Sequence, residues 1–390
     1  TGRIIYPDGY IFNGVMGAAV WTSCPAMILL DLLTNSRYGL GDHISESNLD
    51  LFSFVAASIY SNKVVDDGQG GTEARFSCNV NIQSPKEAFD AINDLSGCMR
   101  CMPIWSAGAV SIAQDKETDP SYLFNLANVS EDGFSYSGSS LKQRHSIISV
   151  SYFNMDSKEV DFETVGDTQS VADVARRQKL GTVIKKVKAF ACTSRNQAAR
   201  LGRAIMFSEE HESEVCTFNT SIDSGILVRP GSVIEINDPV RTGTRRGGRV
   251  VSATTTSITI DAESQTSLTT LDSDGNINSG PNVTNKPTIS VLMPTGVVET
   301  RTITAASSGV LTLDSALSVA PNVNTPFVIS SNTLQTQLFR VIQVEEKDEV
   351  NYQITALTYV PGKYNFIENG DPLPTRTISL LNQVAPSPRA

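Results

Sequence analysis

The hydrophobic positions of residues 192–239 change their period within the segment, from that of a helix to that of a strand. Thr193 or Ser194 can accept a backbone N–H bond where the helix begins. One helix face is then formed by Ala198, Leu201, Ile205 and Ser208, with Arg200 and Arg203 turned away from it. The pattern therefore predicts an amphipathic helix that begins near residue 195.

From Val215 the period is two, which is typical of a strand. Cys216, Phe218 and Ile222 are predicted to share the apolar face. Residues 223–225 and the pair Pro230-Gly231 then indicate two turns, the second with a glycine suited to positive φ, before a strand over 233–236. A helix followed by a β-meander, without a nucleophile or a metal cluster, indicates a structural role.

The first 180 residues mix helical and strand patterns. Helices are expected over 25–33, after a capping pair at Ser47 and Asp50, and over 84–97. Strands are expected over 75–82, 103–105, 110–113, 134–136 and 146–152. Residues 155–180 are polar and charged, and we interpret them as a crossing to the next domain. Two helices on a small sheet predict an α+β domain.

The second half of the chain is dominated by strand patterns. Strands are expected over 248–253 and 257–261, and a hairpin over 338–345 and 350–359 should return the chain to the same sheet. Such a strand number favours a closed or nearly closed barrel. Residues 263–325, whose first part is rich in Ser, Thr, Asn and Gly, are expected to form a small β insertion that could be removed at little cost.

These patterns divide the chain into successive units and give the fold class as α+β and mainly β. The expected units are the end of a preceding element (1–25), an α+β domain (26–180), a β-barrel-like domain (181–262 and 326–365), the insertion (263–325) and a linker (366–390). The absent initiator Met and the Pro-rich end suggest a segment of a longer polypeptide.

The charge and the cysteines narrow the function classes. With 31 basic and 41 acidic residues the net charge is −10, which argues against a general nucleic-acid binder. There is no signal-peptide pattern, and no apolar run approaches the ~20 residues of a membrane span. Six cysteines are too few for a disulfide framework, so we expect free thiols and folding in a reducing cytoplasm.

Four local motifs suggest chemistry, but each lacks a necessary part. Cys98-Met-Arg-Cys101 has no second ligand pair for zinc, so we expect structural thiols that bind no metal. Ser139-Ser-Leu-Lys142 follows a strand and lacks the further motifs of a penicillin-recognising site. The acidic loop 272–278 departs from the EF-hand pattern, and Gly68-Gln-Gly-Gly71 precedes a strand rather than a helix.

A Gly-rich loop carries the cations Arg241, Arg245, Arg246 and Arg249. Such a cluster can contact phosphate, but it more often is solvated or pairs with acidic neighbours in an assembly. We therefore interpret the four arginines as a possible interface. Because no catalytic constellation can be assembled, the sequence indicates a structural protein, without cofactor or metal, that is not an enzyme.

Several motifs, in a fixed order, resemble the lambda-type tail tip attachment proteins (host specificity protein J) of long-tailed phages. They are P-A-x-x-L-L-D-L-L-T-N-x-R-Y-G-L-G at 25–41, D-G-x-G-G-x-E-x-R-F-x-C-N at 67–79, Y-x-G-S-S-x-K-x-R-H at 136–145, C-T-S-R-x-Q-A-x-R-L-G-R with V-x-P-G-x-x-I-x-x-x-D-P at 192–239, and I-T-A-L-x-Y-x-P-x-K-Y at 354–364. The resemblance covers nearly the whole chain except the insertion.

The resemblance implies a homotrimeric hub in the virion, at the distal end of the tail, assembled in the host cytoplasm. Such a hub closes the tube, docks other tip proteins and the tape measure protein, and lets DNA pass through its channel. Receptor binding belongs to modules outside this chain. The alternative is a carbohydrate-binding or depolymerising tail module, which needs an aromatic platform or a carboxylate pair. Two Trp residues and no carboxylate pair argue against it.

Overall fold

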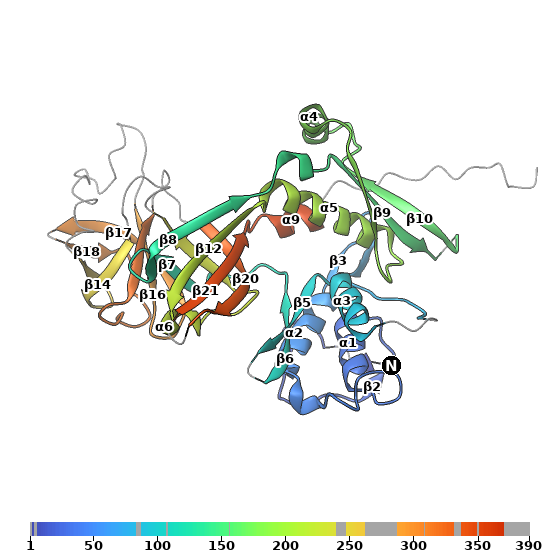
Figure 1. Ribbon diagram of the computed structural model, residues 1–390, viewed down its shortest axis with the longest axis horizontal. Coiled ribbons are helices and arrows are strands. Elements are labelled where there is room, and N and C mark those ends of the chain that lie inside the picture. The colour runs from blue at the N-terminus through green and yellow to red at the C-terminus, as the bar shows by residue number, and fades with distance from the viewer. Residues whose placement is uncertain are drawn as a thin grey trace, which may run out of the picture.

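The computed structural model describes residues 2–3, 6–82, 87–106, 108–155, 157–238, 247–261, 287–307, 309–330, 337–348 and 351–369. Figure 1 shows an N-terminal body beneath helix α5, a small sheet beside α5, a larger sheet in the middle and a barrel at the far end. The predicted class, α+β and mainly β, is confirmed. None of the described helices combines the length and the hydropathy that a membrane crossing requires.

The N-terminal body packs three helices against short hairpins. Its helices are α1 (Pro25–Thr34), α2 (Leu51–Asn62) and α3 (Ala88–Cys98), with β1 (Gly2–Arg3) paired to β2 (Ala19–Val20), β3 (Val64–Asp66) to β4 (Thr72–Ala74), and β5 (Cys101–Ser106) to β6 (Ala109–Gln114). Pro25 opens α1, and the Asp50 carboxylate caps α2 by accepting a bond from the Ser53 N–H. Met27, Phe54 and Leu95 lie in its core.

Three predictions for this body are wrong. Residues 75–82 form no strand, because their backbone N–H groups bond to several different elements: Arg75 to Lys63, Cys78 to Ser23 and Asn79 to Ala191. The helical spacing of Phe52, Val55, Ala56 and Ile59 predicts that they form the apolar face of α2, but Phe52 is 61% exposed, so the buried face is rotated from the predicted one. The third helix begins later than expected, because Glu87 is extended and α3 starts at Ala88, while residues 84–86 lie outside the described ones; α3 extends one residue past Gly97.

A three-stranded sheet, in the order β10-β9-β11, carries α5 on one face. Its elements are β9 (Ile147–Asn154), β10 (Glu159–Val165), α4 (Val171–Leu180), β11 (Ile184–Lys188) and α5 (Arg195–His211). The interpretation of 155–180 as a polar crossing is wrong, since this segment holds β10 and α4. The apolar pattern of β10 is inverted: Val160 and Phe162 are exposed, while Glu163 is buried against Arg195.

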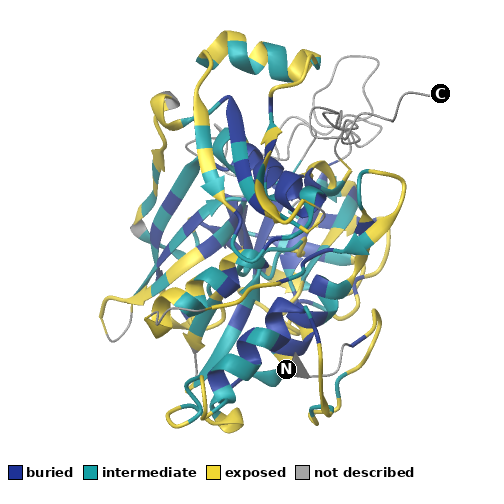
Figure 2. Ribbon diagram, turned by 90° about the vertical axis from the view of Figure 1, so that its right-hand side faces the viewer, coloured by how far each residue is buried: buried dark blue, intermediate teal, exposed yellow. Residues whose placement is uncertain are grey.

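Helix α5 confirms the prediction from residues 192–211, including its cap, where the Ser194 hydroxyl accepts a bond from the Gln197 N–H. Ala198 and Met206 pack on β9 and β10 as the apolar face. The opposite face is buried as well: Arg200 is 3% exposed and Arg203 8%. Helix α5 is therefore packed on both sides and joins two parts of the molecule. Figure 2 shows the buried segments gathered in the interior.

The central sheet has the strand order β7-β13-β20-β21-β12-β8 and is a nearly closed barrel. Its elements are β7 (Tyr122–Asn125), β8 (Val129–Gly138), β12 (Glu214–Ser221), α6 (Ile222–Gly225), β13 (Val233–Asn237), β20 (Gln337–Glu346) and β21 (Asn351–Thr358). Strands β7 and β8 lie at opposite ends of this order, yet a turn at 126–128 joins them, which brings the sheet edges together. The segment 134–136, expected in the α+β domain, lies in β8, and Ile222 is exposed at the start of α6.

A closed six-stranded barrel is inserted between β13 and β20. Its strands are β14 (Gly247–Ala253), β15 (Ser257–Ile260), β16 (Thr288–Leu292), β17 (Val298–Ser307), β18 (Val310–Leu313) and β19 (Pro326–Ser330). Strands β14 and β15 thus pair inside the inserted barrel, so the prediction that they belong to the larger sheet is wrong. Strand alternation alone does not tell which sheet a strand joins. Ile236 faces Gln337 across the ladder, so the barrel occupies the loop of a hairpin.

This topology predicts that a larger deletion is better tolerated than a smaller one. Replacing 239–336 by a short Gly/Ser turn keeps the β13–β20 hairpin, so the remainder should unfold cooperatively. Replacing only 263–325 removes β16–β18 and uncovers the apolar side chains Val250, Ile258 and Phe327. Thermal denaturation should show the lower Tm for the smaller deletion, and the reverse order would contradict the barrel boundaries.

Gly231 has φ +89°, as the predicted turn requires, and a Cβ there would lie 2.5 Å from the Ala113 Cβ. Gly231→Val should therefore lower the free energy of unfolding by about 1–3 kcal/mol through backbone strain. Gly138→Val is the matched control, because Gly138 lies in a strand with open space around its Cβ position. Equal denaturation midpoints for the two variants would contradict this account.

Candidate functional site

Charged side chains are buried or half-buried where the N-terminal body meets α5, the central sheet and α9 (Lys363–Glu368). We call this region the seam. Its members are Glu73, Arg75, Asp115, Arg200, Glu212, Arg340, Lys363 and Glu368. Burial of charge is costly unless each ion is paired, so the geometry of this region is strongly constrained.

Lys363 binds two carboxylates from separate parts of the chain. Its Nζ lies 2.8 Å from Glu212 Oε2, at the end of α5, and 3.1 Å from Asp115 Oδ2, just after β6. Asp115 also accepts a 2.6 Å bond from the Tyr364 hydroxyl and lies 3.1 Å from Arg340 Nη1 of β20. A single ammonium therefore holds the N-terminal body, α5 and α9 together beside the central sheet.

A second group of ions joins β4 and its following segment to α5 and α9. Arg75 Nε lies 2.6 Å from Glu368 Oε1, and the Arg75 guanidinium carbon lies 4.0 Å from the centre of the Tyr60 ring. Arg200 reaches Glu73 Oε1 at 2.7 Å and donates a 2.7 Å bond to the carbonyl of Arg75. The apparent polar face of α5 is thus the face that docks on the N-terminal body.

The surroundings of Asp115 set its ionisation. Burial alone would raise the pKa of this carboxyl, but Lys363, Arg100, Arg340 and the Tyr364 hydroxyl outweigh it, so the pKa lies below its ordinary value. Conversely, burial and the neighbouring Asp115 raise the pKa of Tyr364. Asp115 is therefore a carboxylate at neutral pH, which suits its contacts with Lys363 and Arg340.

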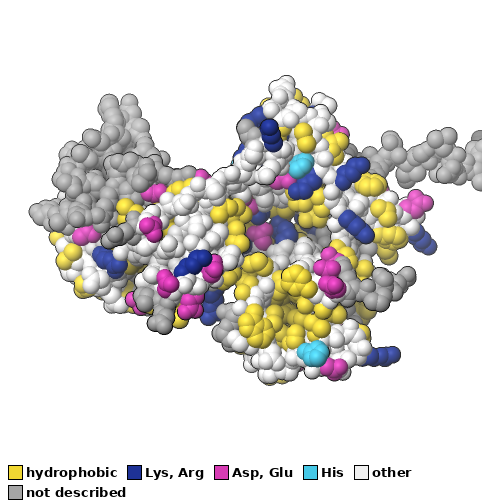
Figure 3. Space-filling view, viewed as in Figure 1, with side chains coloured by type: hydrophobic (Ala, Val, Ile, Leu, Met, Phe, Trp, Pro, Cys, Tyr) yellow, Lys and Arg dark blue, Asp and Glu magenta, His cyan; other side chains and the backbone are white. Residues whose placement is uncertain are grey.

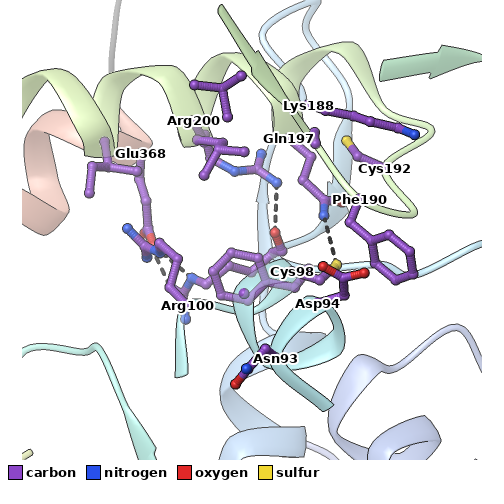
Figure 4. A pocket seen from close by; sticks show the side chains of 17 residues that line it. Asn93, Asp94, Cys98, Arg100, Lys188, Phe190, Cys192, Gln197, Arg200 and Glu368 are labelled. Carbon is purple, nitrogen blue, oxygen red and sulfur yellow. Dashed lines mark hydrogen bonds and ion pairs between the residues drawn. The ribbon is translucent and has the colours of Figure 1, made fainter. Parts of the chain in front are cut away.

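Next to the seam lies a cavity of about 250 Å³ between α3, α5 and the segment that follows β11. Apolar lining comes from residues such as Phe76, Phe190 and Leu201. Cations of Arg100 and Arg200 and carboxylates of Asp94 and Glu368 also line the cavity. Figure 4 shows the labelled side chains around this space, with Gln197 linked to Cys98 and Arg200 linked to the backbone of the segment below it. The cavity is therefore largely apolar, with charges of both signs in its wall.

The thiols near the cavity have pKa values shifted in both directions, and the hydrogen bond with Cys98 lowers the pKa of Cys78. A hydrogen bond with Cys78, together with burial, raises the pKa of Cys98, and burial raises the pKa of Cys101 to about 12. Cys98 therefore pairs with Cys78 rather than with its motif partner. All six cysteines are free, and within the described part of the chain no three His, Cys, Asp or Glu side chains gather as metal ligands.

Of the four arginines interpreted as an interface, only Arg249 is among the described residues; Arg241, Arg245 and Arg246 lie outside them. The Arg249 side chain donates bonds to the carbonyls of Asn324, at 3.0 Å, and Ala127, at 2.6 Å. Ala127 belongs to the turn between β7 and β8. Arg249 therefore fastens the barrel to the central sheet, and an interface formed by the four arginines stays a prediction.

The other motifs take up ordinary structural positions. Ser139 and Lys142 follow β8, where the Ser139 N–H donates to the carbonyl of Ser213, and no long helix begins there. The glycines at 68–71 form the β3–β4 turn, in which the Asp67 carboxylate accepts bonds from the N–H groups of Gln69 and Gly71. The acidic loop 272–278 lies outside the described residues.

Sequence reasoning missed every ion of the seam. Arg200 and Arg203 were noted only as residues turned away from an apolar face, and Lys363 only as part of a resemblance motif. The one available signal was their place inside motifs, at 67–79, 192–203 and 354–364, that lie far apart in the chain. The structure brings those three motifs together at the seam.

Comparison with known proteins gives this arrangement a context. A family described as "Putative phage tail protein" matches residues 87–252. The chain is 29% identical over 369 residues to tip attachment protein J of Escherichia phage SECphi27, and 27% identical over 356 residues to that of Escherichia phage SECphi4. These alignments cover 93% and 90% of this chain. The comparisons support a J-like phage tail protein.

The similarity also supports a location in the tail of the virion. The chain spans 29% of the length of each of these relatives. Among solved structures, a chain of a native gene transfer agent virion matches with a TM-score of 0.43 and 9% identity, over 87% of this chain and 48% of that one. A structural role in a phage tail follows from the curated relatives.

The seam predicts a specific loss of stability in acid. The pKa of Asp115 is lower in the folded protein than in the unfolded chain, where it is near 4. The stability that ionised Asp115 contributes is therefore present above that pH and is lost as the pH falls further. Asp115→Asn should lower the free energy of unfolding by roughly 2–3 kcal/mol at pH 7. The difference in the free energy of unfolding between the variant and the natural protein, measured by urea unfolding, should shrink towards pH 2–3.

Asp348→Asn, in the exposed β20–β21 turn, is the control for this measurement and should change stability little at any pH. If Asp115→Asn lowered the free energy of unfolding by the same amount at pH 7 and at pH 3, the loss could not come from the ion pairs of Asp115.

Proposed function

We propose that the chain is part of the hub of a long-tailed phage tail tip, with three copies around the tail axis and strands forming the wall of a channel. The supporting observation is similarity to tip attachment proteins over nine-tenths of the chain. In this proposal the hub closes the distal tube, docks other tip proteins and the tape measure protein, and links to receptor-binding modules outside this chain.

Large apolar side chains at the surface favour an assembled state. Trp21 is 81% exposed, Phe89 72% and Trp105 66%, all on the N-terminal body. Figure 3 shows apolar side chains gathered over the visible face of this body. A chain that works alone in water rarely keeps such extended apolar surface, so neighbouring proteins are expected to cover it.

A second apolar surface lies on the face of the β10-β9-β11 sheet that α5 leaves uncovered. Val160 and Phe153 stand directly opposite each other in the ladder and are 64% and 42% exposed, and Phe162 is 56% exposed. Strand β10 is also an edge of its sheet. We assign this surface, Phe153, Val160 and Phe162, to the contact between copies of the chain.

The net charge of −10 suits a channel through which DNA passes. An acidic wall repels phosphates and keeps the genome from adhering during its passage. The loop that carries Arg241, Arg245 and Arg246 would then lie away from the wall, at a subunit or partner contact. DNA is a transient passenger in this proposal and not a ligand.

A carbohydrate-binding or depolymerising module is the alternative. It would use exposed aromatic rings as a platform, and Trp21 and Trp105 are exposed but lie on separate elements, before α1 and in β5. Binding of the isolated chain to a glycan array would favour this alternative.

The assembly proposal predicts that Phe162→Glu folds but fails to enter tails. The side chain is exposed, so the free energy of unfolding should change by no more than about 0.5 kcal/mol, whereas a charge buried in a subunit contact is strongly unfavourable. Quantitative mass spectrometry of purified tails should find the variant depleted. Val319→Glu, at a position 47% exposed on the barrel side, is the matched control and should enter normally. Normal incorporation of Phe162→Glu would contradict the assigned contact.

A further inference from the structure

We propose that residues 167–182, which include α4, form a strap that opens as a unit and is held shut by one ion pair, between Arg176 and Glu210. We call this segment the strap. The inference rests on contacts within one copy of the chain, so it does not depend on the proposed assembly. It identifies a movable part that the hub proposal does not use.

Both ends of the strap are fixed at the same residue, Ser146, which is fully buried just before β9. At one end, the Val183 N–H donates a 2.9 Å bond to the Ser146 hydroxyl, and the Ser146 N–H donates a 3.0 Å bond to the Val183 carbonyl. At the other end, Gly166 has φ +90° and lies so close that a Cβ there would be 2.4 Å from the Ser146 carbonyl oxygen. A segment whose ends meet can move without disturbing the sheet that it leaves.

Helix α4 contributes little to the core. None of its 10 residues is buried, and Figure 1 shows it at the top of the view, above α5. A helix of this length is marginal on its own in water, where roughly 12–15 residues are needed. Ser170 gives local support, because its hydroxyl accepts a bond from the Asp173 N–H. The order of α4 therefore depends on what holds it to α5.

One side chain makes the polar attachment. Arg176 donates bonds of 2.7 and 3.1 Å to Oε2 of Glu210 on α5, and its Nη1 lies 2.9 Å from Asp173 Oδ1. The other polar contacts of α4 in the described chain stay within the strap or reach Gly166 at its edge, as does the bond from Arg177 to the Gly166 carbonyl. Among the described residues, the Arg176–Glu210 pair is thus the polar link from α4 to the rest of the molecule.

The space between α4 and α5 is not filled. A cavity of about 260 Å³ lies there, lined by Ala172, Ala175 and Leu180 of α4 and Met206 of α5, together with charged side chains of both signs. Its volume is many times the roughly 10–15 Å³ that one water needs, so the two helices lack close packing here. This leaves the ion pair as the main attachment of the strap.

A single ion pair near the surface is a weak attachment. The Glu210 side chain is 40% exposed and that of Arg176 is 11% exposed, so salt screens their attraction. The strap should therefore open far more often than the sheets unfold. A cationic side chain of a neighbouring protein that binds Glu210 would release the strap in the same way.

Hydrogen–deuterium exchange followed by mass spectrometry measures this opening. In the natural protein, the amides of 171–180 should exchange faster than those of α5 but more slowly than those of an unfolded peptide. Arg176→Met removes the charge and keeps an apolar stem, so exchange in 171–180 should rise about threefold or more, without a change in α5. Raising NaCl from about 0.05 M to about 0.5 M should speed this exchange in the natural protein but not in Arg176→Met.

Gln178→Met is the matched control, because Gln178 is exposed on α4 and Gln and Met have similar helix propensities. It should leave exchange unchanged. Limited trypsin digestion is a second readout, since Arg177 and Lys179 remain in both variants, and cleavage there should be faster in Arg176→Met alone.

Three results would overturn the strap: exchange at 171–180 as slow as in α5, no response to salt in the natural protein, or the same exchange and cleavage rates in Arg176→Met as in Gln178→Met. An equal rise of exchange in α5 would show that Arg176 supports the whole fold, and would also overturn it. The salt comparison uses the natural protein, so it stands even if Arg176→Met does not fold.

Discussion

The structure depends on the burial of one ammonium group, that of Lys363, between the carboxylates of Glu212 and Asp115. Lys363 is 7% exposed and Glu212 is 8% exposed, so neither charge can be left without its partner. Because these residues come from α9, the end of α5 and the segment after β6, satisfying the lysine fixes three parts of the chain relative to one another. Arg340 adds the central sheet through the same aspartate.

This constraint explains why α5 lacks a solvent face. One side of the helix packs its apolar residues on β9 and β10, and the other side places Arg200 and Gln197 against the N-terminal body. The apolar surfaces of the N-terminal body and of β9–β10 are then displayed in a fixed relation. Fixed geometry is what a subunit of a symmetric assembly needs, since each contact must repeat in every copy.

The sequence predicted local elements well where a cap or a turn defines them. The helix after Ser194, the turn at Gly231 and the hairpin 338–359 all lie where expected, because short-range hydrogen bonds and φ preferences decide them. The sheet to which a strand belongs could not be predicted. The alternation in β14 and β15 indicates which face of each strand is apolar, but not which strands lie beside it in the sheet. The seam could not be predicted from the sequence, because arginine, aspartate and glutamate are also the usual residues of a solvated surface. Only the folded chain shows that these side chains are paired and buried.

The proposed hub accounts for three features of the chain: parts held in fixed positions, exposed apolar faces, and a net acidic charge that suits a passage for DNA. The measurement that tests it most directly is an electron cryo-microscopy map of the assembled tail tip. The account predicts three copies of the chain around the tail axis, with the exposed face of β9 and β10 covered by a neighbouring copy. One or six copies, or an axial channel lined by Arg241, Arg245 and Arg246, would contradict it.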